Sequence, residues 1–449
     1  MKKYLAVLCA LVLLLSTIGG MALAEEKTKV VIWTNARADY DYVMSVIEKF
    51  NETNPDIEII YEVYSDNYQQ VLELGFDTGN GPDIYCTNNP IWASISYTGQ
   101  ALPLNDMLTE EQYTFHGENN FVDTINMKDG QILTLPYSFS TPRLVYNKDI
   151  FERVGIEKVP ETFEEVIAAA KLITEKLSGE GIYGFAINLK SPSSSLGRTL
   201  DYMMGPTCGL ANGYNFATGR YEFDKLKEIV SFLRQMFADG STFPGCDQLD
   251  IDPLRTQFAA GRIGMYYSYT GAEYGVYTSQ FVTDIDWDFG PLTGNGTRVG
   301  LQNGDGGRWY AISKDSKVPE EAFEVLSYLQ SKEVLVGSYE AGLHISMIDD
   351  VIASSKTPEA IELHPLMAKQ DTDGLWPLSP TGLSIEGEDY YSVFAGHILG
   401  IPGYEDLDAL TEDLNNRYNA ALDKGLADGT VEANVYPEFD PMKPAASMK

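Results

Sequence analysis

The chain has few of the residues that metal centres require. It contains 4 histidines and 4 cysteines among its 449 residues. The histidines are scattered, and no HExxH motif or Cys–His pairing occurs, so we expect no zinc site. Acidic runs at 284–286 and 371–374 contain alternating aspartates, but neither completes an EF-hand calcium loop. The sequence therefore predicts no metal and no other cofactor.

The scarcity of cysteine also limits disulfide bonds. Cys9 falls within an apolar run at the N-terminus, which leaves Cys86, Cys208 and Cys246 in the remaining chain. In an oxidising compartment Cys208 and Cys246 could pair, with one thiol left over. Three unpaired thiols is the alternative, and the residues alone leave this choice open.

Positive charge is scarce relative to negative charge. The chain has 32 Lys and Arg residues against 65 Asp and Glu residues, a formal net charge of −33. Nucleic-acid phosphates and anionic lipid surfaces would repel such a chain, so we expect neither as a partner. A large net charge favours solubility, and we expect a monomer.

Sequence signatures of catalysis are also missing. No GxSxG or HExxH motif and no Ser/His/Asp context occurs. The glycine-rich run at 304–308 lacks the Lys-Ser/Thr pair of a P-loop and the spacing of a dinucleotide-binding motif. We therefore expect a protein that is not an enzyme. A secreted glycoside hydrolase is a remote alternative, because it needs only a suitable pair of carboxylates among the 65 acidic residues.

Apolar runs of membrane-spanning length are absent too. The run Leu5–Leu15 follows Lys2 and Lys3 and precedes the small-residue site Ala22–Ala24, a pattern typical of a signal peptide over 1–24. No cysteine follows this run where a lipid anchor would need one. We expect the chain to be exported to the periplasm or to the cell surface.

The sequence does contain alternating strand and helix patterns. Apolar residues at 30–33 predict a strand, the spacing over 43–50 predicts a helix, and alternation over 57–63 predicts a second strand. Strand, helix and strand in this order indicate a βαβ unit with a parallel pair. Farther along, a capping box opens a helix at Thr162, and a long helix begins near Leu407 and is expected to stop at Gly425. The chain length favours two domains of the α/β class.

Several fragments resemble one family in order and spacing. The sequence LPY at 135–137 and LVYNKD at 144–149 is accompanied by GPDIY at 81–85, FAAGRIGMYYSYTG at 258–271, WYAISKDSKVPEEAFEVLSYLQSKE at 309–333 and LNNRYNAALDKGLADG at 414–429. These fragments resemble the extracellular solute-binding proteins of sugar ABC transporters, the group that is similar to maltose-binding protein. The resemblance covers nearly the whole chain after the signal peptide.

The resemblance implies a two-lobed periplasmic-binding-protein fold of the class II type, with discontinuous lobes joined by a hinge. It places the crossings between the lobes near 138–143, 299–308 and 345–351. The implied divisions of the chain are a signal peptide (1–24), an N-terminal lobe (25–140 plus 300–348), a C-terminal lobe (141–299 plus 349–430) and a C-terminal tail (431–449).

The resemblance further implies a function. Such a protein captures a monosaccharide or oligosaccharide in the cleft between its lobes and delivers it to the permease subunits of an ABC importer. Sugars are bound by flat aromatic faces and by planar polar side chains. By resemblance, the ligand-binding residues are Asn35, Arg37, Asn88, Asn89, Trp92, Tyr137, Ser138, Tyr267, Tyr269, Asp305, Arg308, Trp376, Tyr390 and Tyr391.

Some of these assignments have structural alternatives. Trp92 could pack in the core instead of stacking on a ligand, and Asn88 and Asn89 could cap a helix. Tyr267 and Tyr269 alternate with their neighbours, so they face one side of a strand. The same fold could also bind a non-sugar solute, such as a polyamine, a glycerol phosphate-type solute or another small solute. The amides, tyrosines and two arginines of the predicted cleft favour a carbohydrate.

Overall fold

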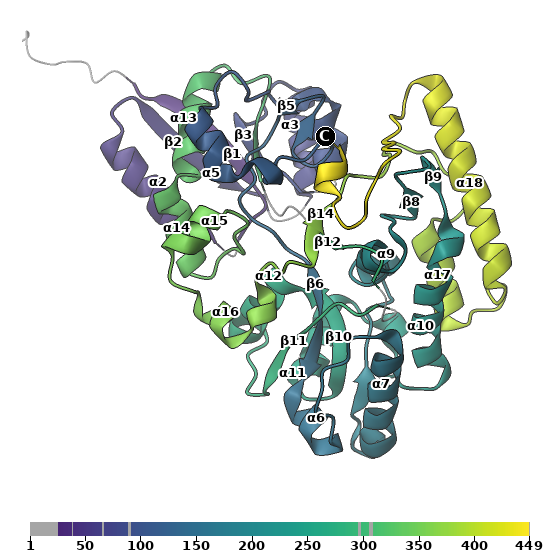
Figure 1. Cartoon of the computed structure of the whole chain (residues 1–449). Coiled ribbons are helices and arrows are strands. Elements are labelled where there is room, and N and C mark those ends of the chain that lie inside the picture. Colours follow the sequence, from purple (N-terminus) through teal and green to yellow (C-terminus); the bar gives the residue numbers. More distant parts are fainter. Residues whose placement is uncertain are drawn as a thin grey trace, which may run out of the picture.

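The computed structural model describes residues 26–37, 39–64, 67–88, 91–294, 298–304 and 309–448. The predicted signal peptide and the predicted site residues Asn89, Asp305 and Arg308 lie outside the described residues. The elements form two lobes on either side of a short two-stranded ribbon (Figure 1). Each lobe packs around a four-stranded sheet of its own.

The N-terminal lobe is built on a sheet with the strand order β13-β3-β1-β2. Strand β1 pairs in parallel with β2 and with β3, and β13 pairs antiparallel to β3, so the predicted βαβ unit is confirmed. Its strands are β1 (Thr28–Thr34), β2 (Ile57–Val63), β3 (Ile84–Cys86) and β13 (Tyr310–Ile312), with a small hairpin of β4 (Met127–Lys128) and β5 (Gln131–Ile132). Its helices are α2 (Tyr40–Thr53), α3 (Tyr68–Asp77), α5 (Glu110–His116), α13 (Pro319–Leu329), α14 (Lys332–Glu340) and α15 (Asp349–Ser354).

The C-terminal lobe is built on a sheet with the strand order β11-β6-β10-β7. Its strands are β6 (Pro142–Asn147), β7 (Tyr183–Phe185), β10 (Ile263–Tyr269) and β11 (Trp287–Gly290), with a hairpin of β8 (Tyr214–Asn215) and β9 (Arg220–Tyr221). Its helices are α6 (Lys148–Val154), α7 (Phe163–Leu177), α8 (Pro192–Leu196), α9 (Leu200–Cys208), α10 (Lys227–Ala238), α11 (Ile251–Ala259), α12 (Thr270–Gly275), α16 (Glu359–Leu363), α17 (Tyr390–Leu399) and α18 (Leu407–Asp428). The capping box expected at Thr162 is present, because its hydroxyl accepts the Glu165 N–H and the Glu165 carboxylate accepts the Thr162 N–H.

A parallel ribbon of β12 (Gln302–Gly304) and β14 (Asp373–Leu375) lies between the lobes (Figure 1). Beside it, Ser138 and Ser346 form an antiparallel bridge. These segments share a small apolar cluster to which Phe139 and Trp309 belong. We call the ribbon and the bridge together the hinge.

A buried ion pair ties the hinge ribbon to the C-terminal lobe. The Arg143 guanidinium in β6 donates to the Asp373 carboxylate in β14 over 2.6 Å, and both side chains are at most 1% exposed. Arg143 also donates to the carbonyl oxygen of Leu366, so the charge is held by more than one partner. Such a pair fixes the register between a lobe and the ribbon, since breaking it leaves a buried charge uncompensated.

One helix ends later than expected, and two other segments lie near the predicted lobe boundaries. Helix α15 packs against α14, although the predicted boundary at 348/349 assigns these helices to different lobes. Helix α18 continues past Gly425 to Asp428 and ends at Gly429, so the predicted stop is wrong. The C-terminal tail leaves α18 and returns to the N-terminal lobe (Figure 1), with Pro441 accepting a hydrogen bond from the Leu301 N–H on the way. The predicted lobe boundaries stay a prediction.

Cys208 and Cys246 are free thiols, so the disulfide considered between them is not formed. Cys208 lies in the last turn of α9, where its thiol donates to the Met204 carbonyl, and Cys246 is buried in the core of the C-terminal lobe. Burial raises the pKa of both thiols to about 12. No helix in the described part of the chain is long and apolar enough to span a membrane, and no cluster of possible metal ligands occurs there.

Candidate functional site

A cavity of about 480 Å³ lies where the C-terminal lobe, the hinge ribbon and Ile125 of the N-terminal lobe meet. Its walls come from α9, the ends of β10 and β12, helices α17 and α18, and a segment that follows β14. A volume in the range of roughly 300–1,000 Å³ is typical of small-molecule sites. Because its walls lie on both sides of the hinge, a motion about the hinge would change the size of the cavity.

Tyrosine dominates the cavity walls. The lining tyrosines are Tyr202, Tyr221, Tyr269, Tyr390, Tyr391 and Tyr418. The rings of Tyr202 and Tyr269 meet edge to face with centroids 5.7 Å apart, and those of Tyr390 and Tyr391 lie 4.0 Å apart. Each ring offers a flat apolar face and a polar hydroxyl, which suits a ligand with both C–H faces and hydroxyl groups.

Asp201, in the first turn of α9, is the one charged side chain that lines the cavity among the residues the structure describes. Its carboxylate accepts the hydroxyl protons of Tyr390 over 2.8 Å and of Tyr391 over 2.6 Å. The Asn212 amide donates to the same carboxylate over 3.4 Å. Burial raises the pKa of the Asp201 carboxyl to about 6, although the bonds from the two tyrosines oppose this. The carboxylate is therefore mainly ionised at neutral pH.

Asn212 reaches this carboxylate from the turn between α9 and β8. Its φ of 51° lies in the left-handed region, which asparagine adopts more readily than most residues. Its amide also donates to the Tyr390 hydroxyl over 3.3 Å. The turn thus completes a polar cluster of four residues, which we call the Asp201 cluster: Asp201, Asn212, Tyr390 and Tyr391.

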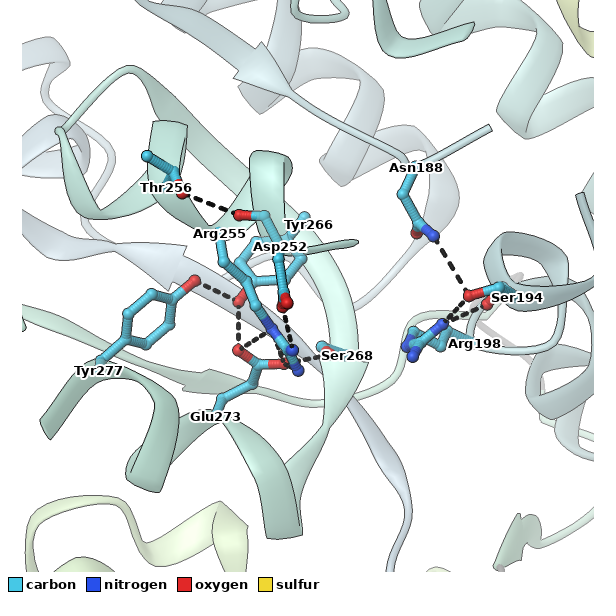
Figure 2. A network of polar contacts seen from close by, with 10 residues as sticks. All are labelled: Asn188, Ser194, Arg198, Asp252, Arg255, Thr256, Tyr266, Ser268, Glu273 and Tyr277. Atoms are coloured by element: carbon cyan, nitrogen blue, oxygen red, sulfur yellow. Dashed lines mark hydrogen bonds and ion pairs between the residues drawn. The ribbon is translucent and has the colours of Figure 1, made fainter. Parts of the chain in front are cut away.

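A second buried carboxylate fixes the strand end that carries Tyr269 (Figure 2). Glu273 of α12 is fully buried and accepts hydrogen bonds from Arg255 over 2.5 Å and from Tyr266 over 2.8 Å. It also accepts the hydroxyl proton of Ser268, the residue before Tyr269. Burial lowers the pKa of Arg255, but the Glu273 charge outweighs this and the net shift is upward. Because this carboxylate is satisfied by several donors, the end of β10 is held rigidly.

The N-terminal lobe has a separate polar cavity of about 500 Å³. It lies at the ends of β1 and β3 and contains the predicted residues Asn35 and Asn88, together with Gln69, Gln70 and Glu73 of α3. The Asn88 side chain accepts the N–H of Ile91 over 3.1 Å, as expected if it caps the helical segment that follows, which includes the π-helix Trp92–Gln100. Carboxyl ends of parallel strands are common positions for ligand contacts.

The tyrosine-lined cavity contains four of the predicted ligand residues: Tyr269, Trp376, Tyr390 and Tyr391. Trp376 is only 1% exposed and packs edge to face on Phe439, with ring centroids 5.3 Å apart. Trp376 therefore contributes to the cavity wall mainly by packing in the layer beneath its surface. The roles of all four as ligand contacts stay a prediction.

The other predicted residues that the structure describes do not line this cavity. Trp92 is buried in the core of the N-terminal lobe, where its indole N–H donates to the Thr124 carbonyl over 2.5 Å. Tyr267 is buried in the C-terminal lobe, and its hydroxyl bonds to that of Thr293. Ser138 belongs to the hinge, Tyr137 packs against the apolar cluster beside it, and Arg37 is exposed after β1.

Sequence reasoning missed Asp201, Tyr202, Asn212 and the lining residues that follow Trp376 in the segment after β14. Asp201 has no motif around it, and its partners Tyr390 and Tyr391 lie 189 and 190 residues away in the chain. In the sequence, the adjacent pair Tyr390-Tyr391 was the signal that pointed to this part of the site.

Comparison with known proteins identifies relatives of this architecture. The family model of the bacterial extracellular solute-binding proteins matches residues 34–335. The sn-glycerol-3-phosphate-binding periplasmic protein UgpB of Salmonella paratyphi A is 28% identical over 293 residues, which are 59% of this chain and 64% of that protein. The chain thus spans less than two thirds of the length of this curated relative.

Solved structures share the fold at low sequence identity. The cyclic alpha-maltosyl-1,6-maltose binding protein from Arthrobacter globiformis aligns with a TM-score of 0.69 at 16% identity, covering 89% of this chain and 100% of that one. An ABC transporter solute-binding protein from Thermotoga lettingae, solved with alpha-D-tagatose, aligns with a TM-score of 0.64 at 18% identity, covering 87% and 100%. The predicted two-lobed fold is confirmed.

Proposed function

The chain belongs to the bacterial extracellular solute-binding protein family, and from this premise we propose that it captures a carbohydrate between its lobes for an ABC importer. The ligand is a monosaccharide or oligosaccharide bound in the tyrosine-lined cavity beside the hinge. The protein is exported by its N-terminal signal peptide, works as a monomer and catalyses no reaction. Its membrane partner is the permease of the importer.

One observation carries this proposal: a cavity of about 480 Å³ that is lined by tyrosines and contacts the hinge. Aromatic faces pack against the apolar face of a sugar ring, and the hydroxyl and amide groups bond to its hydroxyls. A ligand that contacts both lobes binds the closed form better than the open one. It shifts the population toward closure by this difference in affinity.

The relatives suggest a second candidate, sn-glycerol-3-phosphate, because UgpB of Salmonella paratyphi A binds this solute. A phosphate ester requires converging Arg or Lys side chains. Among the described residues, the cavity lining contains no Arg or Lys side chain and one carboxylate, Asp201. These charges favour the carbohydrate over the phosphate ester.

The test is a thermal-shift screen with tagatose, glucose, maltotriose and xylotriose beside sn-glycerol-3-phosphate and spermidine. A saccharide at a hundredfold excess over its Kd should stabilise the protein by roughly 2.7 kcal/mol. Tyr269→Ala should weaken the effective saccharide, whereas Tyr40→Ala, at a residue 41% exposed and outside the cavity, should not. A response to spermidine or to sn-glycerol-3-phosphate alone would refute the carbohydrate assignment.

A further inference from the structure

At the Asp201 cluster the cavity wall offers hydrogen-bond acceptors, because the hydroxyl donors of its two tyrosines are already engaged. A tyrosine carries one O–H proton, and those of Tyr390 and Tyr391 both point to the Asp201 carboxylate. Each phenol oxygen can therefore offer a ligand only its lone pairs. An ionised carboxylate is likewise an acceptor and not a donor.

The two tyrosine hydroxyls stay directed at the Asp201 carboxylate because every member of the Asp201 cluster is buried or half-buried. Asp201 is 9% exposed and Tyr390 is 5% exposed. Burial, together with the Asp201 charge, raises the pKa of both Tyr390 and Tyr391, so both phenols keep their protons. The Asn212 amide donates to the carboxylate and to the Tyr390 oxygen, which further discourages rotation of the Tyr390 hydroxyl.

The hydrogen-bond acceptors of the Asp201 cluster discriminate between the two candidate solutes, a saccharide and sn-glycerol-3-phosphate. Sugar hydroxyls donate to tyrosine oxygens and to a carboxylate. A phosphate ester at neutral pH brings mainly acceptor oxygens and negative charge, so it would lack partners here and would be repelled by Asp201. A site that is built for a hydrogen-bond donor rejects a ligand that lacks one.

We propose that Asp201 is the specificity-determining residue of this site: by holding the protons of Tyr390 and Tyr391, it selects neutral solutes that donate through hydroxyl groups and rejects phosphate esters. This inference rests on the proposed function and names the chemistry by which the same cavity chooses its ligand.

Arg198, which precedes α9, does not offset this negative charge. Its guanidinium donates to the carbonyl of Ser194 over 2.5 Å and to the Ser194 hydroxyl over 2.6 Å (Figure 2). It also lies over the Tyr269 ring, 5.3 Å from the centroid. The cation is therefore directed to Ser194 and to an aromatic face rather than presented to the cavity, whose lining does not include it.

The experiment measures binding by titration calorimetry with two probes, the strongest saccharide of the screen and sn-glycerol-3-phosphate. The wild type should bind the phosphate ester at least a hundredfold more weakly than the saccharide. In Asp201→Asn, the amide donates one proton and turns one tyrosine hydroxyl toward the cavity. Its saccharide Kd should rise tenfold or more, and the preference over the phosphate ester should shrink by at least the same factor.

Tyr391→Phe is the second variant, and it keeps the test valid if Asp201→Asn fails to fold. It removes one acceptor oxygen but keeps the ring, so saccharide affinity should fall threefold or more. The matched control is Glu388→Gln, which alters a similar tyrosine–carboxylate bond, from Tyr404 over 2.6 Å, outside the cavity. This variant should bind both probes as the wild type does.

The outcomes separate the two claims. Unchanged saccharide binding and unchanged preference in the folded variants would overturn the role of Asp201 and leave the carbohydrate assignment standing. Tight binding of sn-glycerol-3-phosphate to the wild type would overturn the role of Asp201, and with no saccharide bound it would overturn the proposed function as well. Binding of neither probe would overturn both.

Discussion

The substitution Asp373→Asn in the hinge ribbon should destabilise the protein strongly. Asp373 accepts from Arg143 over 2.6 Å, and its side chain is fully buried. The asparagine keeps the shape of the side chain but removes its negative charge. The Arg143 charge then remains buried, with only neutral partners such as the Leu366 carbonyl, which bonds over 3.2 Å.

The expected loss in the free energy of unfolding is about 3–5 kcal/mol, the usual cost of removing one partner from a buried pair. The matched control is Glu333→Gln. Glu333 bonds to Lys49 over 2.9 Å, but the two side chains are 81% and 63% exposed. Solvent screens such a pair, so its loss should cost less than about 1 kcal/mol.

Urea unfolding followed by circular dichroism measures both changes. The double variant Arg143→Met/Asp373→Leu should recover more than half of the loss, because apolar residues of similar volume often replace a buried pair at little cost. If Asp373→Asn and Glu333→Gln lost the same free energy, the reasoning about the hinge ion pair would be refuted.

Other substitutions test the core and the hinge. Trp92→Phe removes the indole donor from the Thr124 carbonyl, so the free energy of unfolding should fall by about 1–3 kcal/mol; an unchanged urea midpoint would contradict the buried bond. Burial lowers the pKa of His116 to about 4, so the unfolded chain binds a proton first as the pH falls below 6.5. Between pH 6.5 and 4, the free energy of unfolding of the wild type should therefore fall by up to about 3 kcal/mol more than that of His116→Asn. Parallel profiles of this free energy against pH would argue against the prediction. Gly304→Ala places a methyl group against the Phe139 ring in the hinge and should cost about 1–3 kcal/mol; a melting temperature equal to that of the wild type would exclude this collision.

Local sequence patterns predicted most of the helices and strands named in advance, whereas the features that were missed depend on contacts between residues far apart in the chain. The βαβ unit and the capping box at Thr162 were predictable because periodicity and capping depend on neighbouring residues. The strand Asp373–Leu375 was missed, because three residues carry no periodic signal. Gly425 lies inside α18 and does not end it; Val431 packs so closely against this glycine that there is no room for a side chain.

The site was predictable only where the family resemblance supplied positions. Tyr269 and the Tyr390-Tyr391 pair were predicted in this way, and the structure brings them to one cavity. Asp201 could not be predicted from the sequence, since an aspartate in the first turn of a helix commonly serves only to stabilise the helix N-terminus. Its importance becomes visible only when folding brings the two tyrosines to its carboxylate.

A crystal structure of the protein with the strongest saccharide of the screen would test the central claim most directly. We expect a sugar ring in the cavity, against the Tyr269 face, with hydroxyls donating to the Asp201 cluster and with Ile125 in contact from the other lobe. A saccharide bound elsewhere on the surface, with the tyrosine-lined cavity empty, would contradict the account.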